Sequence, residues 1–182
     1  MTIIKSLTTP ALKGLTLEFC GSPEFHTTSS LLSFISRSSC QLRRLALCLP
    51  PARTKALIKC LEAVPSLVDL KLQPLPCVDT QVLFSQLTRQ PEFLPALESL
   101  YLVFPKSGIA GVSPATASLV VDMLCWRRSA TPLQEFHLLH GYHQSIFAAE
   151  IGANTKFRKL RREGMSLFIG EWYQDESFMD GS

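Results

Sequence analysis

The sequence predicts an α/β fold: a solenoid of about five to six irregular units, with a parallel β-sheet on the concave face and helices outside. Three observations predict it. The phrase L-x-x-L-x-L, once with Phe for Leu, occurs five times along the 182 residues. Segments with helical spacing of apolar residues separate the copies. The chain is 46% apolar and 18% charged, which is typical of a folded domain with a core.

Each copy of the phrase predicts one strand, because its last two apolar positions alternate as the buried face of a strand requires. A proline or a cysteine stands one or two residues before every copy, and proline tends to end a preceding helix. One unit cannot bury its own apolar strand face, so the copies are expected to stack on one another. The five triplets are Leu12, Leu15 and Leu17; Leu42, Leu45 and Leu47; Leu67, Leu70 and Leu72; Leu97, Leu100 and Leu102; and Leu133, Phe136 and Leu138.

The segments between the copies predict helices that cross from one strand to the next, and strands joined in this way run parallel. In the third helix Asp79 is the expected N-cap. In the fourth, Arg127 and Arg128 suit the C-terminal end of the helix itself. The residues expected on the buried faces are Leu31, Leu32, Phe34 and Ile35; Leu57, Ile58, Leu61 and Val64; Val82, Leu83 and Leu87; and Leu119, Val120, Met123 and Leu124.

The two ends of the chain are predicted to be irregular. Residues 2–9 look like the last turns of a helix from an earlier unit, so the polar cap that solenoids need is expected to be missing at the N-terminus. The array is expected to cover residues 1–170. Residues 171–182 carry four acidic side chains and no basic ones, which predicts a disordered acidic tail.

A sixth, imperfect unit is expected before this tail. Residues 155–164 predict a basic helix that Gly164 can terminate. The alternation of Met165, Leu167 and Ile169 then predicts the last strand of the sheet.

With this phrase the chain resembles leucine-rich repeat proteins. The second apolar positions of the triplets lie 30, 25, 30 and 36 residues apart, whereas such repeats typically span about 20 to 29 residues. Cys20 occupies the Asn/Cys position of the longer repeat consensus, but the other copies carry Pro50, Leu75, Pro105 and Gly141 there. The regular asparagine ladder is therefore absent, which indicates an irregular type of repeat.

More narrowly, the chain looks like the C-terminal repeat region of F-box proteins from mushroom-forming fungi. The phrases SLTTPALKGLTLEF, SSLLSFISRSSCQLRRLAL, FLPALESLYL and LVDMLCWRR carry this resemblance, which spans most of the chain. It implies that the repeats select a protein substrate, while an N-terminal F-box docks on a Skp-family adaptor of a cullin-type ubiquitin ligase. No F-box-like segment is found in this sequence. A Skp-family partner is thus expected only if an F-box precedes the chain, and a truncated or non-functional repeat fragment stays open as an alternative.

Sequence features limit where in the cell the protein is expected. No secretory signal is visible, and no run approaches the roughly 20 apolar residues that a membrane span needs, so no membrane partner is expected. The six cysteines form no CxxC pair, which argues against metal knuckles and redox motifs and favours a reducing compartment. An intracellular protein, cytoplasmic or nuclear, is the expectation.

The chemistry-bearing residues predict neither an enzyme nor a cofactor, metal or small-molecule site. Of His137, His140 and His143, the first two differ by an odd offset on a predicted strand and should point to opposite faces, so one metal ion could not easily collect all three. The glycines in residues 107–114 do not form a phosphate-binding motif. A small α/β enzyme is a weaker alternative, because the predicted carboxyl ends of the strands are rich in Pro and Gly and poor in catalytic residue types.

The basic run of residues 156–163 has five bases but no interleaved aromatic platform, which argues against nucleic acid. The natural functional surface of a repeat array is instead the concave sheet. The residues between the inward leucines, Val103 and Leu139 included, are expected to point there. They mix both charges with aromatic rings, which suits protein recognition. The candidate protein-binding residues are Arg44, Asp69, Lys71, Tyr101, Glu135 and His137.

Overall fold

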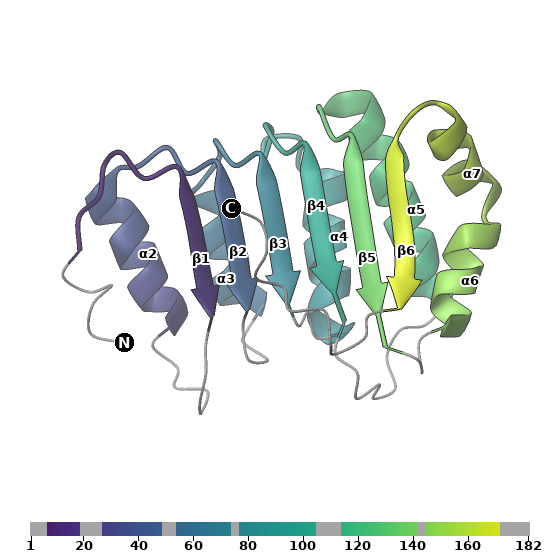
Figure 1. Cartoon of the computed structure of the whole chain (residues 1–182), viewed down its shortest axis with the longest axis horizontal. Coiled ribbons are helices and arrows are strands. Elements are labelled where there is room, and N and C mark those ends of the chain that lie inside the picture. Colours follow the sequence, from purple (N-terminus) through teal and green to yellow (C-terminus); the bar gives the residue numbers. More distant parts are fainter. Residues whose placement is uncertain are drawn as a thin grey trace.

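A computed structural model describes the chain over residues 7–18, 27–48, 54–73, 77–104, 114–141 and 145–171. These residues form one six-stranded sheet in which every strand is parallel to its neighbours and the strands follow the order of the chain (Figure 1). The predicted α/β alternation and all six predicted strands are confirmed. The strands are β1 (Gly14–Glu18), β2 (Arg44–Cys48), β3 (Asp69–Gln73), β4 (Ser99–Val103), β5 (Glu135–His140) and β6 (Ser166–Glu171).

The register of the sheet brings the repeated leucines into columns that cross all six strands. Leu45 pairs with Leu70, and Leu70 in turn with Leu100. From β2 to β5 these inward positions are at most 2% exposed. The two columns consist of Leu15, Leu45, Leu70, Leu100, Phe136 and Leu167, and of Leu17, Leu47, Leu72, Leu102, Leu138 and Ile169.

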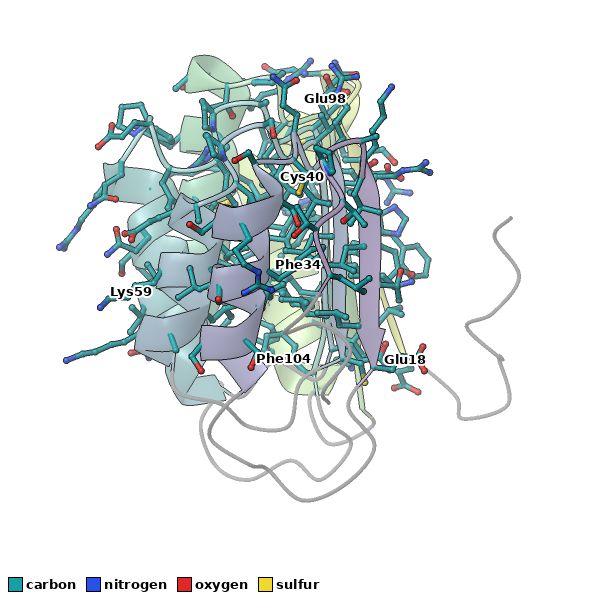
Figure 2. All side chains as sticks on the ribbon, turned by 90° about the vertical axis from the view of Figure 1, so that its left-hand side faces the viewer. Glu18, Phe34, Cys40, Lys59, Glu98 and Phe104 are labelled. Carbon is teal, nitrogen blue, oxygen red and sulfur yellow. The ribbon has the colours of Figure 1, made fainter. Side chains whose placement is uncertain are left out.

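All the described helices lie on one face of the sheet, where they cover these columns (Figures 1 and 2). Parallel sheets usually have helices on both faces and correspondingly continuous apolar strands. Here the strands alternate between apolar and mostly polar positions, so only one face is built for a helix layer. The helices are α2 (Thr27–Ser38), α3 (Thr54–Glu62), α4 (Cys77–Arg89), α5 (Pro114–Ala130), α6 (Ser145–Ala153) and α7 (Thr155–Arg162).

Several details of the predicted helices are wrong. Helix α4 begins at Cys77, so Asp79 lies inside its first turn and is not the N-cap. Val82 is 43% exposed, because the buried face of α4 is formed by Leu83, Phe84 and Leu87 instead. Leu119 of α5 and Leu32 of α2 are only partly buried. In these helices apolar residues outnumber the positions on the buried face, so spacing alone could not select the right ones.

The crossover from β5 to β6 contains a helix that the sequence pattern did not predict. Helix α6 has the sequence SIFAAEIGA, with Phe147 and Ile151 buried. Its small residues give it almost no polar face, so it lacks the amphipathic period by which helices are recognised.

The expected basic helix follows α6 and ends as predicted. Gly164 has φ +88°, a left-handed conformation that glycine adopts without strain. Its N–H donates to the Arg161 carbonyl, and the N–H of Met165 donates to that of Leu160. This Schellman arrangement satisfies the last carbonyls of α7 and directs the chain into β6.

A buried arginine joins two helices. Arg127 of α5 is fully buried. Its guanidinium donates to the carbonyls of Leu87 and Gln90 at the end of α4, and to those of Phe93 and Leu94 just beyond. Arg127 and Arg128 lie in the last turn of α5, as predicted. The side chain of Arg127, however, caps the neighbouring helix, whose C-terminal carbonyls attract a cation. Burial lowers the pKa of Arg127 to about 10, which leaves it charged at neutral pH.

The ends of the array are less buried than its middle. Leu15 and Leu17 of β1 are only partly buried, and Leu7 is 42% exposed. Residues 7–9 are not helical, which contradicts that part of the helix expected over residues 2–9. The rest of that helix, Cys20 and residues 172–182 of the tail lie outside the described residues.

Candidate protein-binding face

The sheet face opposite the helices, here called the open face, carries side chains in rows that run across the strands. Because the strands are parallel and in register, one residue from each strand contributes to a row. No helix of the described residues covers this face (Figure 2). The aromatic row consists of Thr16, Ala46, Lys71, Tyr101, His137 and Phe168, and the polar row of Gly14, Arg44, Asp69, Ser99, Glu135 and Ser166.

Four successive members of the aromatic row are stacked side by side. The ammonium of Lys71 lies 5.0 Å from the centroid of the Tyr101 ring. The rings of Tyr101 and His137 stack with centroids 4.8 Å apart and an interplanar angle of 17°, and the ring of Phe168 follows at 5.6 Å from that of His137. Neighbouring strands are about 4.8 Å apart, a spacing that allows rings at equivalent positions to stack.

The polar row holds one ring of this stack in place. Nε2 of His137 lies 2.7 Å from Oε1 of Glu135, two residues earlier on the same strand. The hydroxyl of Ser99 donates to the other carboxylate oxygen of Glu135 at 3.1 Å. The carboxylate therefore joins β4 to β5 and restricts the rotation of the imidazole.

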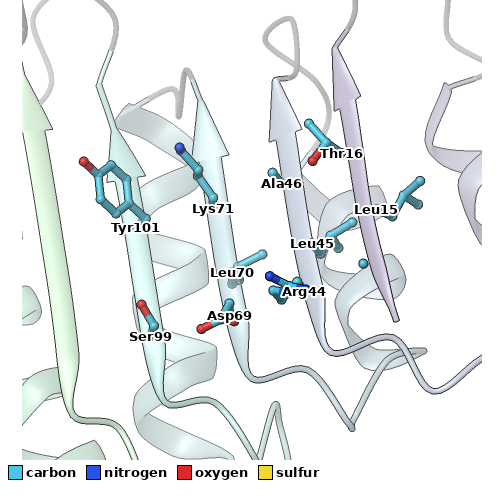
Figure 3. A pocket seen from close by; sticks show the side chains of 11 residues that line it. Leu15, Thr16, Arg44, Leu45, Ala46, Asp69, Leu70, Lys71, Ser99 and Tyr101 are labelled. Carbon is cyan, nitrogen blue, oxygen red and sulfur yellow. The ribbon is translucent and has the colours of Figure 1, made fainter. Parts of the chain in front are cut away.

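A hollow of about 370 Å³ lies beside the stack, over β1 to β4 (Figure 3). It forms because Gly14, Thr16 and Ala46 have small or absent side chains, whereas Lys71 and Tyr101 in the next two strands are long. The charged side chains in its lining are Arg44, Asp69 and Lys71. Burial lowers the pKa of Lys71, because its ammonium is partly removed from water.

Two residues near the carboxyl ends of β4 and β5, Val103 and Leu139, are less exposed than expected. Val103 and Leu139 were predicted to face outward with Tyr101 and His137, and their register places them in that alternation. They are nevertheless only 1% and 8% exposed. The exposed part of the open face is therefore narrower than the strand pattern predicts, because Val103 and Leu139 add no exposed side chain to it.

The six candidate residues all lie on the open face, but the structure divides them into two groups. Glu135 and His137 are hydrogen-bonded to each other on β5, and the ring of His137 stacks on that of Tyr101. Arg44 and Asp69 line the hollow on β2 and β3, together with Lys71. Tyr101 and Lys71 belong to both groups, since both also line the hollow.

Phe168 is the member of the face that the sequence analysis missed. It is 48% exposed and continues the stack onto β6. A signal was present, because Met165, Leu167 and Ile169 were predicted to face inward. The residue between the last two must then face outward.

The histidines that could have suggested a metal site are not brought together among the described residues. His140 is buried with Nδ1 3.0 Å from the Gly141 carbonyl, while His137 lies on the open face, and His143 is outside the described residues. Across the described part of the chain, no three His, Cys, Asp or Glu side chains are placed to hold a metal ion. Burial raises the pKa of Cys60 to about 12, so this thiol stays protonated and packs as an apolar group.

The basic helix α7 exposes its five bases, and two of them are paired. Lys156 contacts Asp122 of α5 at 2.9 Å, and Lys159 lies 3.7 Å from Glu163. These pairs reduce the net charge that the helix presents. The prediction that nucleic acid is not a partner is not tested by any contact in the structure.

Comparison with other proteins adds no family. The chain matches no protein-family model, no curated protein and no solved structure. Within the described residues, no helix combines the length and the apolar character needed to cross a membrane. The inference of function must therefore start from the open face itself.

Proposed function

We propose that the chain is an irregular leucine-rich repeat solenoid that recognises a partner protein through the open face of its sheet. The observation that carries this proposal is the asymmetry of the sheet. Each strand sends the apolar residues of its triplet into a helix layer on one side, and presents rows of polar and aromatic residues on the other. A repeat array exposes such a surface without further cost in stability, because its core lies entirely on the other side.

The backbone supports the repeat interpretation. The carbonyls of Lys13, Arg43, Val68 and Glu98, each one residue before its strand, accept two N–H groups from the next unit. The recurrence of one bonding pattern at four successive steps is the behaviour expected of stacked equivalent units. The uneven gaps between units fall in the crossovers, where helix lengths range from 9 to 17 residues among α2 to α5.

In the cell, we propose that the chain serves as the substrate-recognition part of an F-box adaptor of a cullin-type ubiquitin ligase. The resemblance of its phrases to the repeat region of such proteins supports this role. The size of the face suits it, because six strands about 4.8 Å apart and about 17 Å long offer roughly 400 Å². Stable complexes of folded domains bury about 800 Å² on each partner. A short segment of a substrate therefore fits better than a whole domain.

Affinity capture from cells that express the tagged chain tests the proposal. Tyr101→Ala combined with His137→Ala removes the centre of the stack, and should abolish capture of the specific partner. The matched control, Lys55→Ala with Lys59→Ala, changes two exposed residues of helix α3 and should leave capture intact. If the variant with Tyr101→Ala and His137→Ala captured the partner as well as the control does, the open face would be excluded as the recognition surface.

The ligase role needs a separate readout. If it holds, loss of the chain should lengthen the half-life of the captured protein, and inhibition of cullin ligases should do the same. A captured protein with an unchanged half-life would leave the recognition proposal standing and remove the ligase role.

A further inference from the structure

The hollow over β1 to β4 has a charge composition that selects among partners. Arg44 and Lys71 contribute two positive charges to its lining, and Asp69 contributes one negative charge. Arg44 and Asp69 are paired in register on β2 and β3, and Lys71 follows Asp69 on the same side of β3 (Figure 3). The charged lining therefore sums to one positive charge.

Lys71 is the side chain that gains most from an incoming anion. Its ammonium lies over the Tyr101 ring, where burial already lowers its pKa. A partly desolvated cation attracts an anion more strongly than a fully hydrated one, because the local dielectric constant is lower. Electrostatic complementarity of this kind sets the specificity of a binding site more than its overall affinity.

We infer that the hollow binds the carboxylate of an aspartate or glutamate in an extended segment of the partner protein. This inference rests on the proposed recognition function. A monoanionic carboxylate matches the single net positive charge of the lining. Asp69 repels a phosphorylated side chain, with its charge of about −1.5 to −2, more strongly than it repels a carboxylate, and the single net positive charge of the lining cannot neutralise a dianion. The small side chains of Thr16 and Ala46 leave room for the segment to run across the strands toward the aromatic stack.

Selection of random dodecapeptides on the full chain, followed by affinity measurements with the best peptide, tests this inference. The selected peptides should share one acidic position. Replacing that residue by its amide should weaken binding to the wild-type chain about five- to tenfold. Binding should also weaken as ionic strength rises.

Substitutions in the hollow should change affinity in opposite directions. Lys71→Met should weaken binding of the acidic peptide about five- to tenfold and abolish its advantage over the amide peptide. Asp69→Asn should strengthen binding about two- to threefold, and should let the phosphoserine version bind at least as well. Lys59→Met removes an equivalent charge from the opposite side of the molecule, as the labels of Figure 2 show, and should change nothing.

Several results would overturn the inference. Selected peptides that lack an acidic position but are lost with Tyr101→Ala would retain recognition by the open face and exclude the carboxylate. A phosphoserine peptide that binds the wild-type chain tenfold more tightly would assign the hollow to phosphate. Absence of any selected peptide would count against recognition of extended segments altogether.

Two competing occupants are distinguished by the same assay. If Asp175→Asn with Glu176→Gln raises the affinity of the acidic peptide in the full chain, the hollow binds the chain's own acidic segment. If the peptide dissociates a dimer in sedimentation, the occupant is a second copy. Either result overturns assignment to a partner protein, whereas unchanged affinity and a peptide-independent mass support it.

Discussion

The two faces of the sheet are built from alternate residues of the same six strands, yet they differ in which substitutions they tolerate. Toward the helices, the positions from β2 to β5 are leucines or one phenylalanine, all nearly inaccessible to water. Toward the open face, the same strands carry Arg44, Lys71, Tyr101 and His137. The inward positions are constrained by packing, where a missing methyl group leaves a cavity. The residues of the aromatic and polar rows lie outside this core, so substitutions there are expected to cost less stability.

The largest effect is expected on the inward face. Leu70→Ala removes a side chain that is 1% exposed at the centre of the first leucine column, and should lower the free energy of unfolding by about 3 to 5 kcal/mol. Urea denaturation monitored by circular dichroism measures this loss. Leu70→Met, which conserves volume, should cost less than about 1.5 kcal/mol. A loss below about 1 kcal/mol for the alanine variant would mean that the column is not a continuous core.

The next largest loss of stability is expected at Arg127, which is as deeply buried as these leucines but polar. Arg127→Met leaves carbonyls of α4 and the following turn without their donor, and should cost about 2 to 4 kcal/mol. Arg127→Lys keeps the charge but lacks the planar fork, so it should restore only part of the loss. Arg128→Met is the matched control, because Arg128 is exposed and, among the described residues, donates a single long hydrogen bond, 3.3 Å to the Glu163 carbonyl. Comparable losses for the two arginines would contradict the capping role.

A smaller effect is expected where the inward face reaches the edge of the sheet. Leu15 occupies the same column as Leu70 but is only partly buried. Leu15→Ala should therefore cost about 1 kcal/mol, in proportion to the smaller apolar area that it removes from water. Its ratio to the Leu70→Ala loss measures how sharply packing falls off along the array. Equal losses would show that packing does not weaken toward this edge of the sheet.

The smallest effect on stability is expected on the open face. Tyr101→Ala removes one stacked ring, which contributes about 0.5 to 1.5 kcal/mol in comparable pairs, and leaves the leucine core unchanged. We expect a loss of no more than about 1 kcal/mol, together with loss of partner capture. A loss as large as that of Leu70→Ala would erase the distinction between the two faces.

The comparison also explains which parts of the site were predictable. The alternation along a strand fixes the side to which a residue points, so the six candidate residues could be assigned to one face from sequence. It does not fix whether that side is exposed. Val103 and Leu139 have the correct parity for the open face but are buried. The stack of Lys71, Tyr101 and His137 depends on the side-chain conformations that bring the three groups into contact, which the pattern of apolar residues does not contain.

The sequence by itself determined the strands, their parallel order and the inward columns, because the triplet repeats a local period and each copy needs its neighbours to bury it. Only the tertiary structure decided the course of the Arg127 side chain, the helix α6 and the hollow beside Lys71. Each of these depends on what lies next to it in space. The carbonyls that bind Arg127 come from residues 33 to 40 positions earlier in the chain. A local pattern reports the conformation that a segment prefers, whereas a cap, a buried charge or a hollow is a relation between distant segments.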